Sequence, residues 1–251
     1  MTLAQLLSPD FWPGKALSAL RAVWGSAWLL LCRPSRQSAR VAQLAMQVTP
    51  AYTMLSPDRL DQLYGAVRRA DALGIKGALV ECGTWNGGSA AVMAAASRDS
   101  GWLERRHVWV FDSFEGLPPP GEREGTAERR GFFPGWCTGD PAKVDAILRR
   151  QSVAPERLHI VRGWLTETLP GAATGPIAVL HVDLDWYEAV ALALSALFPR
   201  VAPGGLMVVD DYGKWPGCRA ATDEFLKQTP SAVRLPPVNR ISVRLQKRSA
   251  P

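Results

Sequence analysis

Short apolar runs alternate with segments of helical spacing along most of the chain. The runs cover residues 77–82, 107–111, 158–161, 177–182 and 206–209, and helical patterns at 89–97, 142–151 and 189–198 lie between most of them. Apolar strands that alternate with helices are typical of a parallel sheet with both faces covered. Because crossovers between parallel strands are right-handed, the pattern predicts an open, doubly wound α/β sheet.

Both ends of the chain extend this pattern. Residues 232–235 and 241–245 are further strand candidates, which we expect to form an antiparallel pair at the end of the parallel sheet. Residues 1–50 have a helical pattern, and Ser56-Pro57-Asp58 predicts the start of another helix that reaches about Leu73. We therefore expect a mostly parallel, seven-stranded, Rossmann-like sheet over residues 51–251 and a helical N-terminal extension over 1–50.

One long connection interrupts the alternation. Residues 116–139 are rich in Pro, Gly, Glu and Arg, and they also carry Phe132, Phe133 and Trp136. Long connections with such aromatic side chains inside a compact domain are often lids or binding loops. We expect a lid-like loop here, with an ordinary surface loop as the alternative.

The composition is that of a globular protein. The chain has 251 residues, of which 47% are hydrophobic and 21% charged, enough for one large domain with a buried core. The net charge of +6 raises the question of nucleic acid, but the arginines occur as scattered pairs at 68–69, 105–106, 129–130 and 149–150. Such pairs are typical of helix ends and solvated faces, so we expect no nucleic-acid partner.

The cysteines and the first apolar stretch indicate where the protein works. The four cysteines are far apart and form no metal-binding spacing, which is typical of free thiols in the cytoplasm. Residues 16–32 are apolar, but Arg21 interrupts them and leaves too few residues to cross a bilayer. We expect an amphipathic helix that packs on the domain or on a second subunit, and hence a homodimer. Association with a membrane surface is the less favoured alternative.

The ends of the first three predicted strands have features of a cofactor site. The first strand runs into Glu81 and a turn with Gly83, where a ligand can approach the backbone closely, although this turn alone is a weak signal. Asp112 ends the second strand, where an acidic residue can accept hydrogen bonds from a ribose diol; capping a turn is its alternative role. Trp164 follows the third strand and either flanks an adenine or packs in the core.

Four carboxylates follow the next two strands. Asp183 and Asp185 end the strand at 177–182, and Asp210 and Asp211 end the strand at 206–209. In an extended chain Asp183 and Asp185 point to the same side, and the two strand ends are neighbours in a doubly wound sheet. Buried like charges need compensation, and hard oxygen ligands favour Mg²⁺, with Mn²⁺ or Ca²⁺ as alternatives. Capping of the following helices is the other explanation for these aspartates.

These blocks together resemble a known family. The segments VECGTWNGGS, FDSFEGLP, HVDLDWYEAV and VAPGGLMVVDDYGKWPGCRAATDEF are similar to those of the macrocin O-methyltransferase (TylF) family, from about Tyr52 to Phe225. The resemblance implies a class I methyltransferase that uses S-adenosylmethionine and Mg²⁺ and methylates sugar hydroxyls. Leu184 stands where some members have glycine, and the N-terminal region and residues 116–139 do not resemble them closely.

The resemblance also implies roles for individual residues. It assigns the metal to Asp183, Asp210 and Asp211, with Asp183 also near the cofactor, and it assigns the general base to Asp185. The cofactor-binding residues that it implies are Thr53, Met54, Glu81, Gly83, Ser89, Asp112, Ser113 and Trp164. His181, two residues before Asp183, is a rival base, ranked lower because a histidine inside a strand is more often a satisfied core residue.

The predicted reaction is methyl transfer to a hydroxyl group of a small molecule or glycan. A hydroxyl is a weak nucleophile at neutral pH, so coordination to a cation and removal of its proton by a base would both be needed. Two other possibilities stay open at this point. One is a catechol-type methyltransferase that acts on a vicinal aromatic diol, and the other is a non-catalytic partner protein with the same fold.

Overall fold

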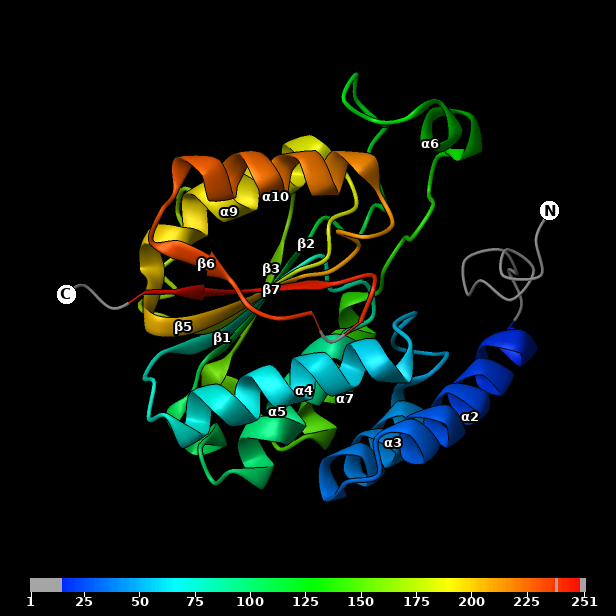
Figure 1. Ribbon diagram of the computed structural model, residues 1–251, viewed down its shortest axis with the longest axis vertical. Helices are drawn as coiled ribbons and strands as arrows, with labels where there is room; N and C mark the ends of the chain where they lie inside the picture. The colour runs from blue at the N-terminus through cyan, green and yellow to red at the C-terminus, as the bar shows by residue number, and fades with distance from the viewer. Residues whose placement is uncertain (1–14, 238, 249–251) are drawn as a thin grey trace.

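A seven-stranded sheet forms the centre of the protein. The computed structural model describes residues 15–237 and 239–248, and its strands lie in the order β3-β2-β1-β4-β5-β7-β6 (Figure 1). They are β1 Ala78–Cys82, β2 Val108–Asp112, β3 Leu158–Arg162, β4 Ile177–Val182, β5 Val201–Val209, β6 Ala232–Arg234 and β7 Val243–Lys247. The first five strands are parallel, and β7 runs antiparallel to both β5 and β6. This is the doubly wound, mostly parallel α/β fold that the sequence predicts.

Helices cover both faces of this sheet. The face at the bottom of Figure 1 carries α4 Pro57–Ala72, α5 Gly88–Asp99 and α7 Pro141–Arg150, with α2 Lys15–Cys32 and α3 Arg36–Val48 outside them. The other face carries α8 Leu165–Thr168, α9 Tyr187–Leu197 and α10 Pro216–Gln228, while α6 Thr126–Gly131 lies in the long loop. Short 3₁₀ turns occupy Leu103–Arg105, Pro155–Arg157 and Phe198–Arg200.

The core follows from strand alternation. Leu79 packs with the layer that contains α4 and α5, whereas the next residue, Val80, packs with the layer that contains α9 and α10. Register extends each row across the sheet, since Leu79 pairs with Val179, which pairs with Leu206. All three belong to the same buried cluster, so one row of side chains across β1, β4 and β5 supports the lower helices.

Several local predictions need correction. α10 is a full helix that the sequence pattern does not predict, and β7 begins two residues later than the predicted strand at 241–245. Ser56 lies at the N-cap of α4, but its side chain makes no capping hydrogen bond. These differences leave the topology unchanged. Among the described residues, no helix combines the length and apolarity needed to cross a membrane.

Arg106 is buried, contrary to the prediction that the arginine pairs lie on solvated faces. Its guanidinium bonds the Asp71 carboxylate of α4 and donates to the backbone oxygens of Ile75 at 2.9 Å and Gly77 at 2.6 Å. A fully buried guanidinium needs such partners because its desolvation is costly. Arg106 thereby ties the end of α4 to the segment that enters β1 and to the start of β2.

The turn after β1 depends on a residue without a side chain. Gly83 has φ +83°, and a Cβ built there would lie 1.8 Å from the backbone oxygen of Asp183. The ends of β1 and β4 therefore approach each other more closely than any side chain at 83 would allow.

Gly83→Ala should destabilise the protein far more than Gly74→Ala. Gly74 also has a positive φ of +68°, but a Cβ there would have no neighbour within 4 Å. The control should cost only about 1 kcal/mol of unfolding free energy, from backbone strain. Gly83→Ala adds the clash and should cost more than about 4 kcal/mol or prevent folding. Urea unfolding of the two variants tests this, and equal losses would contradict the close approach.

Candidate active site

The site lies where the strand order reverses, between the carboxyl ends of β1 and β4. Ligands of open α/β sheets bind at such a switch point. Here the turn 83–88 leads from β1 into α5, whose first residue, Gly88, packs against the loop before α4. A Cβ on Gly88 would lie 2.7 Å from the Thr53 Cβ and from the backbone oxygen of Tyr52. This contact brings the predicted cofactor residues Thr53 and Met54 against the turn.

Asn86 fixes this turn from two sides. Its Nδ2 donates to the backbone oxygen of Ala51 at 3.1 Å, and its Oδ1 accepts from the backbone N–H of Asp140 at 3.0 Å. Thr53 and Ser89 are buried beside it, while Met54 is exposed. Sequence reasoning did not single out Asn86, because its partners lie in distant loops.

Glu81 is turned into the protein. Its Oε1 lies 2.7 Å from His181 Nδ1 of the neighbouring β4, and its Oε2 accepts a hydrogen bond from Thr84 Oγ1 at 2.5 Å. Both groups are fully enclosed. Glu81 thus orients His181 and the glycine-rich turn, and its predicted contact with the cofactor stays a prediction.

Asp112 holds two backbone segments together. Its carboxylate accepts from the N–H of Trp85 at 2.8 Å and from the N–H of Phe114 at 2.7 Å. Burial raises the pKa of Asp112, although these backbone hydrogen bonds act in the opposite direction. Ser113 accepts from the Glu115 N–H at 3.1 Å. The turn-capping alternative for Asp112 is therefore realised, and contact with a ribose remains compatible because each carboxylate oxygen has a second lone pair.

Asp210 has a cationic partner that the sequence did not reveal. Arg59, from the first turn of α4, bonds both carboxylate oxygens of Asp210, with Nε at 3.1 Å from Oδ1, and the two side chains are buried. Ser242 Oγ donates to the same Oδ1 at 2.8 Å. The Arg59 guanidinium also lies 3.8 Å from Asp211. The compensation that we expected from a metal ion is thus supplied in part by an arginine.

The other three carboxylates differ in how far their charge is compensated. Burial and the Asp210 charge raise the pKa of Asp183 well above its usual value. Burial and the Asp211 charge do the same to the pKa of Asp185. For Asp211, burial opposes ionisation, but Arg59 and Lys214 lower its pKa overall. Two cations therefore face four acids at this edge of the sheet.

The backbone conformation that places Asp185 in the cluster differs from the predicted one. The chain is not extended after Asp183, because Asp185 has φ +58° and α9 begins two residues later. Trp215 donates its indole N–H to Asp185 Oδ1 at 2.5 Å. Asp185 is therefore held at the site by a turn and by an aromatic side chain rather than by strand alternation.

Aromatic side chains build a wall above Asp185. Trp215 packs edge to face against Trp186, with ring centroids 5.6 Å apart, and against Trp136, with ring centroids 6.4 Å apart. Trp136 in turn stacks on Phe133. Trp136 and Phe133 come from the loop at 116–139, and Phe133 remains exposed. An apolar surface next to a half-buried acid is suited to exclude water from a reacting hydroxyl.

Polar contacts hold the same loop over the site. Trp186 Nε1 donates to the Pro118 backbone oxygen at 2.9 Å, and the buried Glu124 accepts from the Tyr187 N–H at 2.7 Å. Arg123 Nη2 donates a hydrogen bond to Glu224 Oε1 of α10 at 2.5 Å. Residues 116–139 therefore contact α9 and α10, as a lid-like loop would, although this role stays a prediction.

The cluster also fits a cation. Ligand atoms of His181, Asp183 and Asp210 lie within 4.8 Å of one another. His181 Nε2 and Asp211 Oδ1 are buried atoms without a hydrogen-bond partner among the described residues. Such orphaned atoms normally mark a bound water or ion. The donor set is rich in oxygen, which suits a hard divalent cation. His181 is bonded to Glu81 through Nδ1, as a core histidine would be, and only its Nε2 lacks a partner among the described residues.

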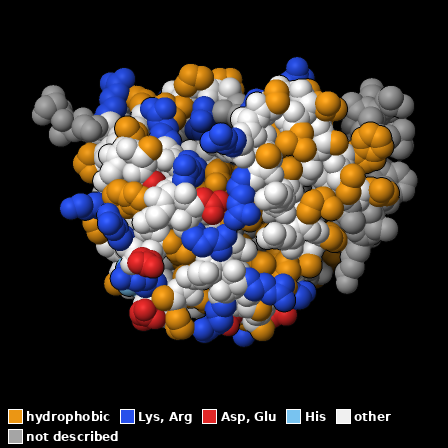
Figure 2. Space-filling view, turned by 90° about the horizontal axis from the view of Figure 1, so that it is seen from below, with side chains coloured by type: hydrophobic (Ala, Val, Ile, Leu, Met, Phe, Trp, Pro, Cys, Tyr) orange, Lys and Arg blue, Asp and Glu red, His pale blue; other side chains and the backbone are white. Residues whose placement is uncertain are grey.

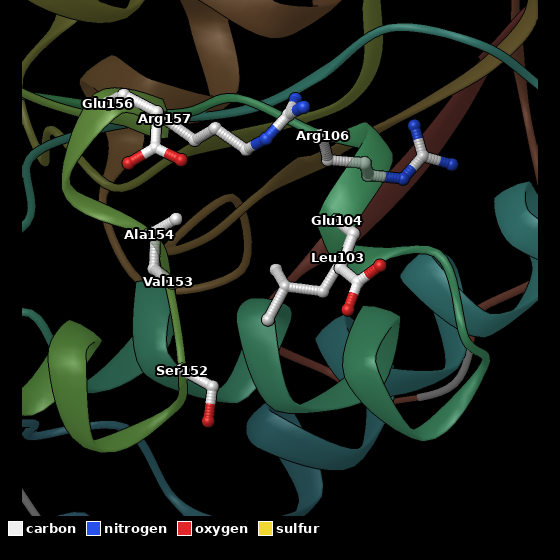
Figure 3. Close-up of a pocket in the computed structure, with 8 residues that line it drawn as sticks. All are labelled: Leu103, Glu104, Arg106, Ser152, Val153, Ala154, Glu156 and Arg157. Carbon is white, nitrogen blue, oxygen red and sulfur yellow. The ribbon is translucent and has the colours of Figure 1, made fainter.

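The pocket in Figure 3 lies away from this site. Leu103, Arg106, Ser152 and Glu156 are among the residues that line it, close to the amino-terminal ends of β2 and β3. Ligands of open α/β sheets bind at the opposite, carboxyl-terminal edge, so this pocket has no part in the candidate site.

Comparison with known proteins identifies the family. The family model of macrocin O-methyltransferase (TylF) matches residues 29–246. The chain belongs to the macrocin O-methyltransferase (TylF) family. It is 39% identical over 178 residues to 8-demethyl-8-(2,3-dimethoxy-alpha-L-rhamnosyl)-tetracenomycin-C 4′-O-methyltransferase of Streptomyces olivaceus, covering 70% of this chain and 67% of that protein. It is 32% identical to demethyldecarbamoylnovobiocin O-methyltransferase of Streptomyces niveus, covering 78% and 76% respectively.

A solved structure supports the same conclusion. The O-methyltransferase NovP superposes with a TM-score of 0.72 at 27% identity, over 94% of this chain and 100% of NovP. As a member of the TylF family, the chain is an S-adenosylmethionine-dependent O-methyltransferase, and the fold and enzyme class predicted from the sequence are confirmed. Membership decides against the non-catalytic alternative.

Asp183→Asn should stabilise the metal-free protein at neutral pH. The folded-state pKa of Asp183 is raised, so the ionised carboxylate costs folding free energy above that pKa and costs nothing below the unfolded value. Removing the charge should raise the unfolding free energy by about 1–2 kcal/mol at pH 7. The gain should disappear as the pH falls through the raised pKa toward the unfolded value. Urea unfolding in a chelator tests this, and a loss of stability at pH 7 would contradict it.

Proposed function

We propose that this enzyme transfers a methyl group from S-adenosylmethionine to a sugar hydroxyl of a natural product or glycan, with Mg²⁺ as a second cofactor. The observation that carries the metal is the excess of acid at the end of β4 and β5, where Arg59 and Lys214 face four aspartates. Support for the sugar comes from a relative that is named a rhamnosyl-tetracenomycin 4′-O-methyltransferase.

The proposed metal ligands are Asp183, Asp210 and Asp211. His181 Nε2 lies close enough to Asp183 and Asp210 to act as a further ligand or to bind a water molecule beside them. When bound, Mg²⁺ would lower the pKa of the acceptor hydroxyl and fix its position. Because Arg59 bonds both oxygens of Asp210, this aspartate would share its charge between the arginine and the metal.

Asp185 is the proposed general base. Its raised pKa makes the Asp185 carboxylate a stronger base than an exposed aspartate. In the reaction, the acceptor oxygen forms a bond to the methyl carbon, the carbon–sulfur bond of the donor breaks, and the hydroxyl proton passes to Asp185. Trp215 orients the carboxylate through its hydrogen bond to Oδ1.

The donor is proposed to lie along the turn after β1. Its methionine end is proposed to lie at Gly83 and the start of α5, next to Thr53, Met54 and Ser89. Glu81, Asp112, Ser113, Asp183 and Trp164 complete the proposed cofactor residues. Backbone N–H groups at the start of α5 favour the donor carboxylate, since a helix N-terminus binds anions.

The sugar specificity can be tested with a panel of acceptors. Methyl transfer from labelled S-adenosylmethionine should occur with rhamnosides and other glycosides, and not with catechols.

Asp210→Ala should lower kcat by about a thousandfold or more, because it removes a metal ligand, while the donor affinity changes little. Calorimetric titration with S-adenosylmethionine measures the latter.

These experiments can reject the proposed metal and the proposed acceptor independently of each other. Full activity after thorough chelation, or in Asp210→Ala, would eliminate the metal and leave the acceptor class intact. Methylation of catechols alone would eliminate the sugar and favour the catechol-type alternative.

The base is tested by the pH dependence of kcat/KM. Wild-type kcat/KM should rise with pH through the raised pKa of Asp185 and then level off, since only the ionised form accepts a proton. Asp185→Asn should lower kcat by about 100-fold or more and abolish this rise. Trp215→Phe should keep the rise and shift its midpoint upward, because the hydrogen bond lowers the pKa of Asp185. An unchanged profile in Asp185→Asn would transfer the role to His181.

A further inference from the structure

Helix α2 packs one side on the protein and exposes several large apolar residues on the other. Ala22, Ser26 and Leu29 form its buried side. At Gly25 a Cβ would lie 2.7 Å from the ring of Pro57, so α2 packs closely on the first turn of α4. The sequence predicts an amphipathic helix that packs on the domain, and this side of α2 does so.

The outer side of α2 is an apolar stripe. Leu20, Trp24, Trp28 and Leu31 recur at helical spacing, so they share one face, and Trp24 is 73% and Leu31 82% exposed. Val23 and Leu30 widen the stripe. Figure 2 shows apolar side chains gathered at the right of the lower face, in the region of α2. A contiguous apolar surface of this kind marks an interaction site rather than an ordinary solvated helix.

Along the chain, the charged residues nearest to the stripe are all basic, although Arg40 pairs with Asp99 of α5 in the folded protein. Between residues 11 and 57 the sequence contains Lys15, Arg21, Arg33, Arg36 and Arg40 but no Asp or Glu. The stripe itself is uncharged from residue 22 to 32.

Basic side chains gather at the carboxyl end of α2. Arg33 and Arg36 directly follow α2, and both are exposed. Blue side chains outnumber red ones on the face in Figure 2. The apolar stripe therefore borders on basic side chains at its carboxyl end.

This combination distinguishes between two occupants. The sequence favours a second copy of the chain, but a copy would bring the same basic border against itself. A membrane with anionic lipids offers the opposite charge, and tryptophans beside basic residues are typical of helices in the lipid interface. We propose that α2 lies flat in the interface of an anionic membrane, with Leu20, Trp24, Trp28 and Leu31 toward the acyl chains. This inference does not depend on the proposed metal or acceptor.

Vesicle flotation of the full-length protein tests this proposal. The wild type should float with vesicles that contain phosphatidylglycerol and much less with pure phosphatidylcholine. The triple variant Trp24→Ser, Trp28→Ser and Leu31→Ser should lose at least about tenfold in partitioning. Leu31→Ser alone should weaken it measurably, whereas the matched control Leu73→Ser, at an exposed leucine beyond α4, should not.

The contribution of basic residues to vesicle binding is tested with other variants, so that misfolding of the triple variant would not decide the outcome. Arg36→Glu, at an exposed first position of α3, and high salt should each reduce binding to anionic vesicles. Equal flotation with neutral vesicles, or none with either kind, would overturn the proposal. So would a dimer in solution that the triple variant converts to monomers, because the stripe would then be covered by a second copy.

Discussion

The candidate site depends on keeping four carboxylates together at the ends of two adjacent strands. Such a cluster is unstable by itself, because burial and mutual repulsion both disfavour the ionised forms. Arg59 reaches across from the first turn of α4 to Asp210 and offsets part of this cost. The raised pKa values of Asp183 and Asp185 show that the offset is incomplete. An acid cluster kept at this cost to stability is typical of a functional site rather than a structural one.

Strand topology explains why the sequence predicts this cluster. Parallel strands all end at one edge of the sheet, so Asp183 and Asp210, each following an apolar run, had to lie close together once β4 and β5 were neighbours. Arg59 could not be predicted in the same way. It lies 151 residues before Asp210, and a buried arginine in a helix start has no local pattern that separates it from a solvated one.

The finer geometry was unpredictable for related reasons. Alternation along an extended chain suggested how Asp185 would be placed, but a left-handed residue and the indole of Trp215 place it instead. Likewise Asp112 bonds backbone N–H groups of two turns, which depends on loop conformation and not on residue spacing. Sequence patterns determine which strand end a residue occupies, whereas the direction of its side chain depends on long-range contacts.

Helix α2 is the reverse case. Its apolar pattern was clear from the sequence, but what the helix packs against was not. An apolar stretch too short to span a bilayer is compatible with a core helix, a dimer interface or a membrane surface. The structure excludes a helix buried on all sides, because Gly25 packs against Pro57 while Leu20, Trp24, Trp28 and Leu31 are exposed. The family match begins at residue 29, so most of this stripe precedes the part of the chain that defines the family. Helix α2 packs on α4, and α4 also carries Arg59, which bonds Asp210 of the acid cluster. The helix with the apolar stripe is therefore joined to the acid cluster through α4.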